Sequence, residues 1–74
     1  MEVKQKILAD CKKILQCQVN KEQTDWDLWW RQVHAMDAKY VKYSQLEYEY
    51  MQLCLKHIFR ALQTLEGVEL EWQS

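Results

Sequence analysis

A single glycine and no proline occur in the 74 residues of this chain, and this scarcity limits the fold more than any other sequence feature. Glycine and proline supply the backbone conformations of most tight turns, so a sandwich or barrel with many β-turns is excluded. The same scarcity excludes the glycine-rich loops that hold phosphate groups. The chain is therefore suited to long helices with few connections, and its length predicts one domain over residues 1–74.

Apolar side chains recur at helical spacing in the first part of the chain, which predicts a helix over about residues 2–19. The pattern is lost after Val19, where we expect a loop. The side chains expected on the inner face of this helix are Val3, Ile7, Leu8, Cys11, Ile14, Leu15 and Gln18.

A second helix is predicted over about residues 25–43, with Thr24 and Asp27 in the spacing of a capping box at its start. Lys39 and Lys42 suit its last turn, where the helix dipole favours positive charge. Its apolar stripe consists of Trp26, Trp29, Trp30, Val33, Met36 and Tyr40.

Ser44 and Glu47 form a second capping-box pattern, which predicts a break and then a third helix over about residues 46–66, ended by Gly67. The alternative is one helix over 25–66 that forms a hairpin with the first helix and dimerises to bury its stripe. The alternating residues 68–72 are either a short extended tail or a frayed helix end. The core face of the third helix is Met51, Cys54, Leu55, Ile58, Leu62 and Leu65.

Three helices joined by two short connections predict a small all-α three-helix bundle with a C-terminal tail. So short a chain buries only about 60% of its unfolded surface. The four Trp and four Tyr residues then supply buried area that the bundle needs.

The charge of the chain is balanced overall, with ten Lys and Arg against eleven Asp and Glu. This balance makes nucleic acid an unfavourable partner. Residues 1–21 carry a net charge of +3, and residues 44–74 carry −3. Opposite charges favour either antiparallel packing of the first and third helices or head-to-tail self-association. The alternative is that the two segments only have solvated faces of different charge.

The sequence also predicts a cytoplasmic protein. Its cysteines, Cys11, Cys17 and Cys54, are odd in number and form no CxxC pair, as is usual in a reducing compartment. The first residues lack the apolar core of a signal peptide. No uncharged segment is long enough to span a membrane.

The third helix carries more apolar residues than a small bundle can bury, since its apolar arc widens to roughly 240° on a 3.6-residue wheel. The extra side chains are either packed on both neighbouring helices or form an interface. The interface stripe predicted on this helix is Leu46, Tyr50, Leu53 and His57.

A second interface stripe is predicted on the helix over 25–43, where three Trp within five residues cannot all point inward. The alternative is that so small a bundle uses its Trp residues to fill the core. Asp37 falls inside the apolar arc of this helix, so its carboxylate needs a donor such as a Tyr hydroxyl or faces a partner. The predicted members of this stripe are Trp26, Trp30, Asp37 and Val41.

Catalytic and metal sites receive little support from the sequence. His34, Asp37, Cys54 and His57 form two i, i+3 pairs that could in principle bind zinc, but such spacing is generic. Cys54 and His57 on adjacent turns of one helix provide neither a cleft nor an oxyanion hole. We therefore expect no enzyme activity, no cofactor and no metal.

The sequence thus predicts a protein-binding module that forms a homodimer and modulates a larger partner, as bacterial regulators and phage-encoded inhibitors of this size do. One alternative is an adaptor whose tail, residues 68–72, adds a strand to a partner sheet. The other is a weak nucleic-acid binder that uses Lys4, Lys6, Lys12, Lys13, Lys39 and Lys42.

Overall fold

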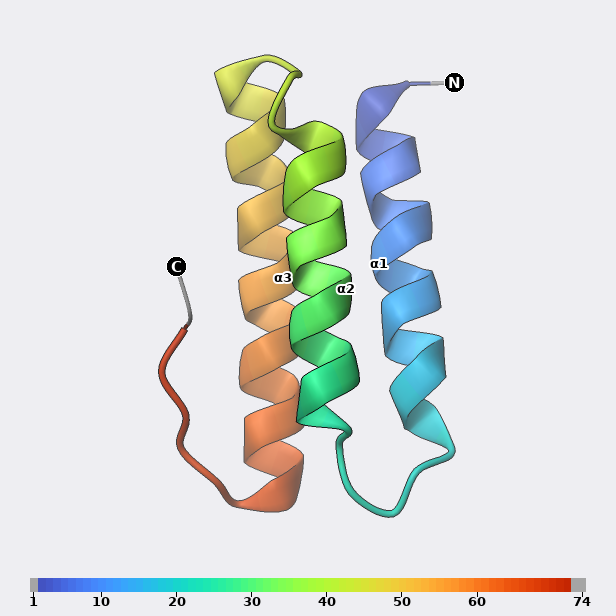
Figure 1. Cartoon of the computed structure of the whole chain (residues 1–74), viewed down its shortest axis with the longest axis vertical. Coiled ribbons are helices and arrows are strands. Elements are labelled where there is room, and N and C mark those ends of the chain that lie inside the picture. Colours follow the sequence, from blue (N-terminus) through green and yellow to red (C-terminus); the bar gives the residue numbers. More distant parts are fainter. Residues whose placement is uncertain (1, 73–74) are drawn as a thin grey trace.

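Three α-helices run alternately down, up and down the long axis of the computed structural model, which describes residues 2–72 (Figure 1). They are α1 (Val3–Val19), α2 (Trp26–Tyr40) and α3 (Gln45–Glu66). The bundle measures 35 × 23 × 17 Å. The predicted all-α three-helix bundle is confirmed, and the predicted boundaries of α1 and α3 are correct to within one residue.

The start of α2 differs from its prediction, because Asp25 and not Thr24 caps the helix. The Asp25 carboxylate accepts a hydrogen bond from the backbone N–H of Leu28 at 3.1 Å. The Thr24 N–H instead donates to the carboxylate of Glu66, which ties the α1–α2 loop to the end of α3. An Asp side chain satisfies a free helix N–H as well as a Thr hydroxyl does, so the cap falls one residue later.

The helix hairpin turns at residues 41–44, which excludes the continuous helix over 25–66. The helix α2 ends at Tyr40, three residues before its predicted end. Ser44 then adopts an extended backbone (φ −60°, ψ 153°) and forms the predicted capping box with Glu47. Because this box satisfies free N–H groups at the start of α3, the chain reverses without a glycine or a proline.

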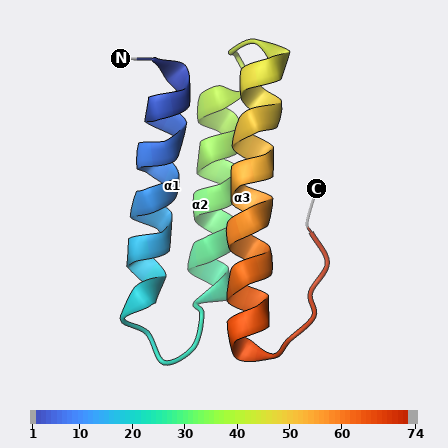
Figure 2. The same ribbon diagram turned by 180° about the vertical axis from the view of Figure 1, so that it is seen from behind.

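Gly67 ends α3 with a left-handed backbone (φ 71°), as its position predicts. The tail after it is neither helical nor part of a strand, so the frayed-helix alternative is wrong for residues 68–72. This tail turns back beside α3 (Figure 2) and places Trp72 against Trp30 and Phe59, with ring centroids 5.3 Å apart in both pairs. The side chain of Gln63 accepts a hydrogen bond from the Leu70 N–H at 2.5 Å and so fastens the tail.

The core fills the axis between the helices and differs from its prediction at the edges of each stripe. Phe59, absent from the predicted core, is 5% exposed and stacks on Trp29 at 6.0 Å. Leu8, Leu15 and Leu65 were expected in the core but are exposed, and Leu65 is 84% exposed. Each helix has only two neighbours, so it buries a narrower arc than its apolar stripe provides. The buried apolar residues are Ile7, Cys11, Ile14, Trp29, Val33, Met36, Tyr40, Met51, Leu55, Phe59 and Leu62.

The helices α1 and α3 run parallel, because two reversals of the chain restore its original direction (Figure 2). The expected antiparallel packing of these two helices is therefore wrong. Among residues 2–72, the helices that an ion pair joins are α1 and α2, where Lys39 Nζ lies 2.7 Å from Asp10 Oδ2. Short connections set the relative direction of α1 and α3. The charge difference between these helices does not, since exposed charge pairs contribute little energy.

Candidate protein-binding surfaces

The side of the bundle where α1 and α3 meet carries two matching apolar stripes. The ammonium of Lys4 lies 5.7 Å from the ring centroid of Tyr50, which sets these two helices at the same level. Positions four, eleven and fifteen residues further on lie on the same side of each helix. Because the helices are parallel, the stripes stay side by side along their length. We call this surface the α1/α3 face; its members are Lys4, Leu8, Leu15, Val19, Tyr50, Cys54, Ala61 and Leu65.

Much of the α1/α3 face is open to solvent. Leu8 is 50% exposed and Val19 is 67% exposed, while Tyr50 and Cys54 are half-buried against the core. The helix α2 contacts both α1 and α3, and no fourth helix in the described part of the chain covers this face. An extended apolar surface of this kind is uncommon on a monomer and is typical of binding sites.

The stripe predicted on α3 borders the α1/α3 face. Leu46 is 72% exposed, Leu53 is 58% exposed, and His57 is exposed as well. Tyr50 is half-buried beneath Lys4 and belongs to the α1/α3 face itself. Three of the four residues of the predicted stripe are thus exposed on the outer side of α3. The exposed α1 residues of the neighbouring face, Leu8 and Leu15, were expected in the core.

The stripe predicted on α2 is divided by the structure. Trp26 and Trp30 are half-buried and pack edge-on against Phe59, with centroids 5.6 and 5.2 Å apart. Trp72 covers Trp30 further, which periodicity within one helix could not indicate. Val41 lies beyond the end of α2 and is 60% exposed.

Asp37 makes the hydrogen bond expected of a half-buried carboxylate. The Tyr48 hydroxyl donates to Asp37 Oδ1, and Gln52 Nε2 donates to the same oxygen at 3.1 Å. This hydrogen bond raises the pKa of Tyr48, and partial burial of the phenol adds to the effect. Asp37 therefore links α2 to α3, in line with the structural alternative for this residue.

An open groove of about 600 Å³ lies between α2, α3 and the tail. Lys56 crosses it, with its ammonium 5.6 Å from the centroid of the Trp72 ring. Since acidic, basic and apolar groups all line this groove, its chemistry selects no single class of ligand. The lining residues are Val33, His34, Asp37, Tyr48, Glu49, Gln52, Leu53, Lys56 and Trp72.

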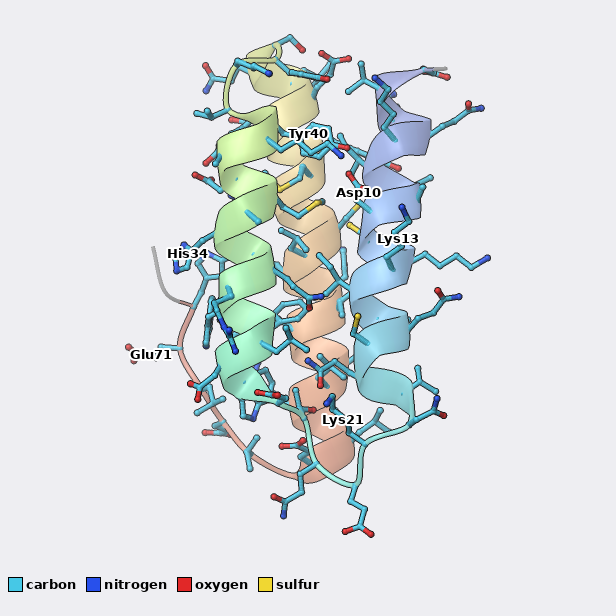
Figure 3. The ribbon with its side chains drawn as sticks, turned by 45° about the vertical axis from the view of Figure 1, so that its right-hand side comes forward. Asp10, Lys13, Lys21, His34, Tyr40 and Glu71 are labelled. Carbon is cyan, nitrogen blue, oxygen red and sulfur yellow. The ribbon has the colours of Figure 1, made fainter. Side chains whose placement is uncertain are left out.

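A second polar link joins α1 to α2, where Asp10 points toward Tyr40 (Figure 3). The Asp10 carboxylate accepts hydrogen bonds from Lys39 at 2.7 Å and from Tyr40 at 2.6 Å. Burial alone would raise the pKa of Asp10, but these two donors outweigh it and hold the pKa below its usual 3.8. For Tyr40, burial and the Asp10 carboxylate both raise the pKa. This link is structural, because the Asp10 carboxylate already accepts hydrogen bonds from both Lys39 and Tyr40.

The four residues considered as zinc ligands do not converge. His34 and Asp37 line the groove between α2 and α3, Cys54 belongs to the α1/α3 face, and His57 is exposed on the outer side of α3. Within residues 2–72, no group of three or more His, Cys, Asp or Glu side chains is placed to hold a metal ion. None of the three described helices has the length and apolar character needed to cross a bilayer.

Comparison of the chain with protein-family models, with curated proteins and with solved structures gives no match.

Proposed function

We propose that this protein is a non-enzymatic binding module that docks on a larger protein through the α1/α3 face and the adjacent outer side of α3, and thereby regulates that protein. The observation that carries the proposal is the pair of parallel stripes with exposed Leu8, Leu15, Val19 and Leu65. Each Leu side chain that a partner buries fully contributes roughly 1.5–3 kcal/mol. A few such residues therefore supply most of the affinity of an ordinary complex.

The exposed side chains of the proposed surface, Leu8, Leu15, Val19 and Leu65, lie outside the core, whereas Tyr50 and Cys54 pack against it. The completely buried residues Ile7, Met51 and Leu55 lie on the neighbouring side of each helix, which faces the core. Substitution of an exposed side chain away from special features changes stability by roughly 0.5 kcal/mol or less. Binding and folding can therefore be tested separately.

The test is an affinity capture from the native host with a double variant, Leu8→Gln and Leu65→Gln, which leaves the net charge unchanged. Loss of two apolar anchors should weaken partner binding at least tenfold, which corresponds to about 1.4 kcal/mol. Circular dichroism should show the same helix content as the wild type. The matched control is Val41→Gln, an apolar residue that is equally open but lies outside the surface.

Capture that is lost in the double variant and kept in Val41→Gln supports the proposal. Capture that survives the double variant refutes it, and loss in Val41→Gln alone transfers the site to the α2 stripe. The expected homodimer is tested by light scattering, where a monomer has a mass of 9.1 kDa. A dimer of twice that mass that the double variant dissociates would use this same surface for self-association.

A further inference from the structure

Between its two ends, which carry Glu2, Glu49 and Glu66, the α1/α3 face is bordered by basic residues. The helix α3 has no acidic residue between Glu49 and Glu66. The acid inside α1 is Asp10, and it is engaged by Lys39 and Tyr40 on the side of α2. The net negative charge of residues 44–74 is thus confined to the ends of α3 and to the tail.

Basic side chains lie beside the apolar stripes in the middle of both helices. Lys12 follows Leu8 by one helical turn and lies between the exposed leucines of α1. On α3, His57 lies one turn before Ala61, and Arg60 is exposed beside it. The middle of the face is therefore an apolar strip bordered by basic side chains from both helices, with Lys12 on α1 and Arg60 on α3 as the permanent cations.

We propose that the α1/α3 face binds an amphipathic helix of another protein, whose apolar side chains are flanked by Asp and Glu. Charge complementarity with the basic border selects such a helix and orients it. The inference rests on the proposed binding function and adds the chemistry of the partner.

The dimensions of the face suit one helix. Its stripes extend over residues 4–19 and 50–65, which is roughly 22 Å at 1.5 Å per residue. A helix of about 16 residues has this length. Laid along two parallel helices, it would contact both stripes through apolar residues spaced three and four apart.

A second copy of this chain is a poorer occupant, because it brings the same cations. If the two-fold axis ran across the helices, α1 would lie antiparallel on α1 of the other copy, and Lys12 near its middle would meet its own equivalent. If the axis ran along the helices, Lys12 would face the segment with His57 and Arg60. No acid of residues 5–19 or 50–65 is free to pair with these charges.

The probe is a synthetic amphipathic helix of 18 residues with Leu on its apolar side, made with either Glu or Lys along the flanks. Fluorescence anisotropy measures its binding to the full chain at low and moderate salt. We expect the Glu peptide to bind at least tenfold more tightly than the Lys peptide, with the difference shrinking as salt rises. The variant Lys12→Glu should remove most of this preference.

The matched control is Lys13→Glu, which makes the same charge change one residue along, on the side of α1 that faces α2. It should leave the preference for the Glu peptide within about twofold of the wild type. Equal binding of the two peptides, or an equal effect of the two lysine variants, overturns the inference. Sedimentation with phosphatidylglycerol vesicles that Lys12→Glu abolishes would also overturn it, since a lipid surface would then be the occupant.

The two proposals fail in different ways. If Leu8→Gln with Leu65→Gln abolishes capture of the native partner but the peptides show no charge preference, the binding surface stands and the partner chemistry is wrong. If the double variant changes neither capture nor peptide binding, both proposals are wrong.

Discussion

Asp10 is the residue whose surroundings most clearly set a pH dependence. The hydrogen bonds from Lys39 and Tyr40 favour its charged form and lower its pKa in the folded state. A lowered folded pKa means that the stabilisation is complete above the unfolded pKa. It is lost as the pH falls through the folded pKa, that is, below the ordinary value of 3.8.

We expect Asp10→Asn to lower the free energy of unfolding at pH 7 by about 1–2 kcal/mol, since hydrogen bonds to a charged group are lost. Urea denaturation followed by circular dichroism measures the change. The difference from the wild type should vanish in strong acid, where Asp10 is protonated. Glu22→Gln in the exposed loop is the control and should change stability little at either pH. A constant difference at all pH values would show that the carboxylate charge is not involved.

The three cysteines differ in accessibility and should react in a fixed order. Cys17 is exposed, Cys54 is half-buried, and Cys11 is only 4% exposed. Burial raises the pKa of Cys11 to about 12, and the nearby Cys54 adds to this rise. With a thiol reagent at pH 8, we expect Cys17 to react first, Cys54 more slowly and Cys11 only on unfolding. Cys17→Ser should remove the fast phase, and a fast phase that remains would contradict this order.

Gly67 shows how one backbone conformation ends an element. Its φ of 71° is in the left-handed region, and a Cβ atom at this position would meet no other atom within 4 Å. The cost of Gly67→Ala is therefore conformational only, and we expect the free energy of unfolding, measured by urea denaturation, to fall by about 1 kcal/mol. Gly67→Asn should cost less, because Asn adopts this conformation more readily. Equal stability of glycine and alanine at this position would show that α3 ends differently.

The tail is the element that joins distant parts of the core by aromatic contacts. Trp72 packs against Trp30 and Phe59, so Trp72→Ala should lower stability by about 1–2 kcal/mol. For a domain of this size, each kcal/mol corresponds to a fall in Tm of roughly 4–8 °C. Glu71→Ala, a neighbouring exposed residue, is the control. An unchanged Tm in Trp72→Ala would mean that the tail does not stabilise the bundle, and would revive its use for strand addition to a partner.

At the scale of the whole molecule, the helix-hairpin topology predicts rapid folding. Most contacts in such a bundle form within one helix or between helices adjacent in sequence, and helical bundles of this kind fold in microseconds to milliseconds. A temperature-jump experiment should show a single relaxation in this range. A slower second phase would indicate that docking of α1 on α3, the contact most distant in sequence, follows as a separate step.

The sequence was sufficient for the three helices and for the break at Ser44, because capping and periodicity are local. It was insufficient for Phe59 and Leu65, whose burial depends on which side of α3 receives a neighbour. For the same reason, the candidate surface was only partly predicted: the sequence indicated part of the α3 stripe but assigned Leu8 and Leu15 to the core. Pairing of α1 with α3 in parallel is a property of the loops and of the core, and no local pattern contains it.

The parallel pairing of α1 and α3 has a consequence for thermodynamics. Leu15 and Leu65, on opposite stripes of the α1/α3 face, are 50 residues apart in sequence and belong to one surface only while the chain is folded. A ligand of this face therefore has no site on the unfolded chain, and its binding must shift the folding equilibrium by RT ln(1 + [L]/Kd). At a hundredfold excess over Kd this is about 2.7 kcal/mol, so a thermal scan reports which molecules bind the folded chain, and loss of the shift in the variant Leu8→Gln with Leu65→Gln assigns a molecule to this surface.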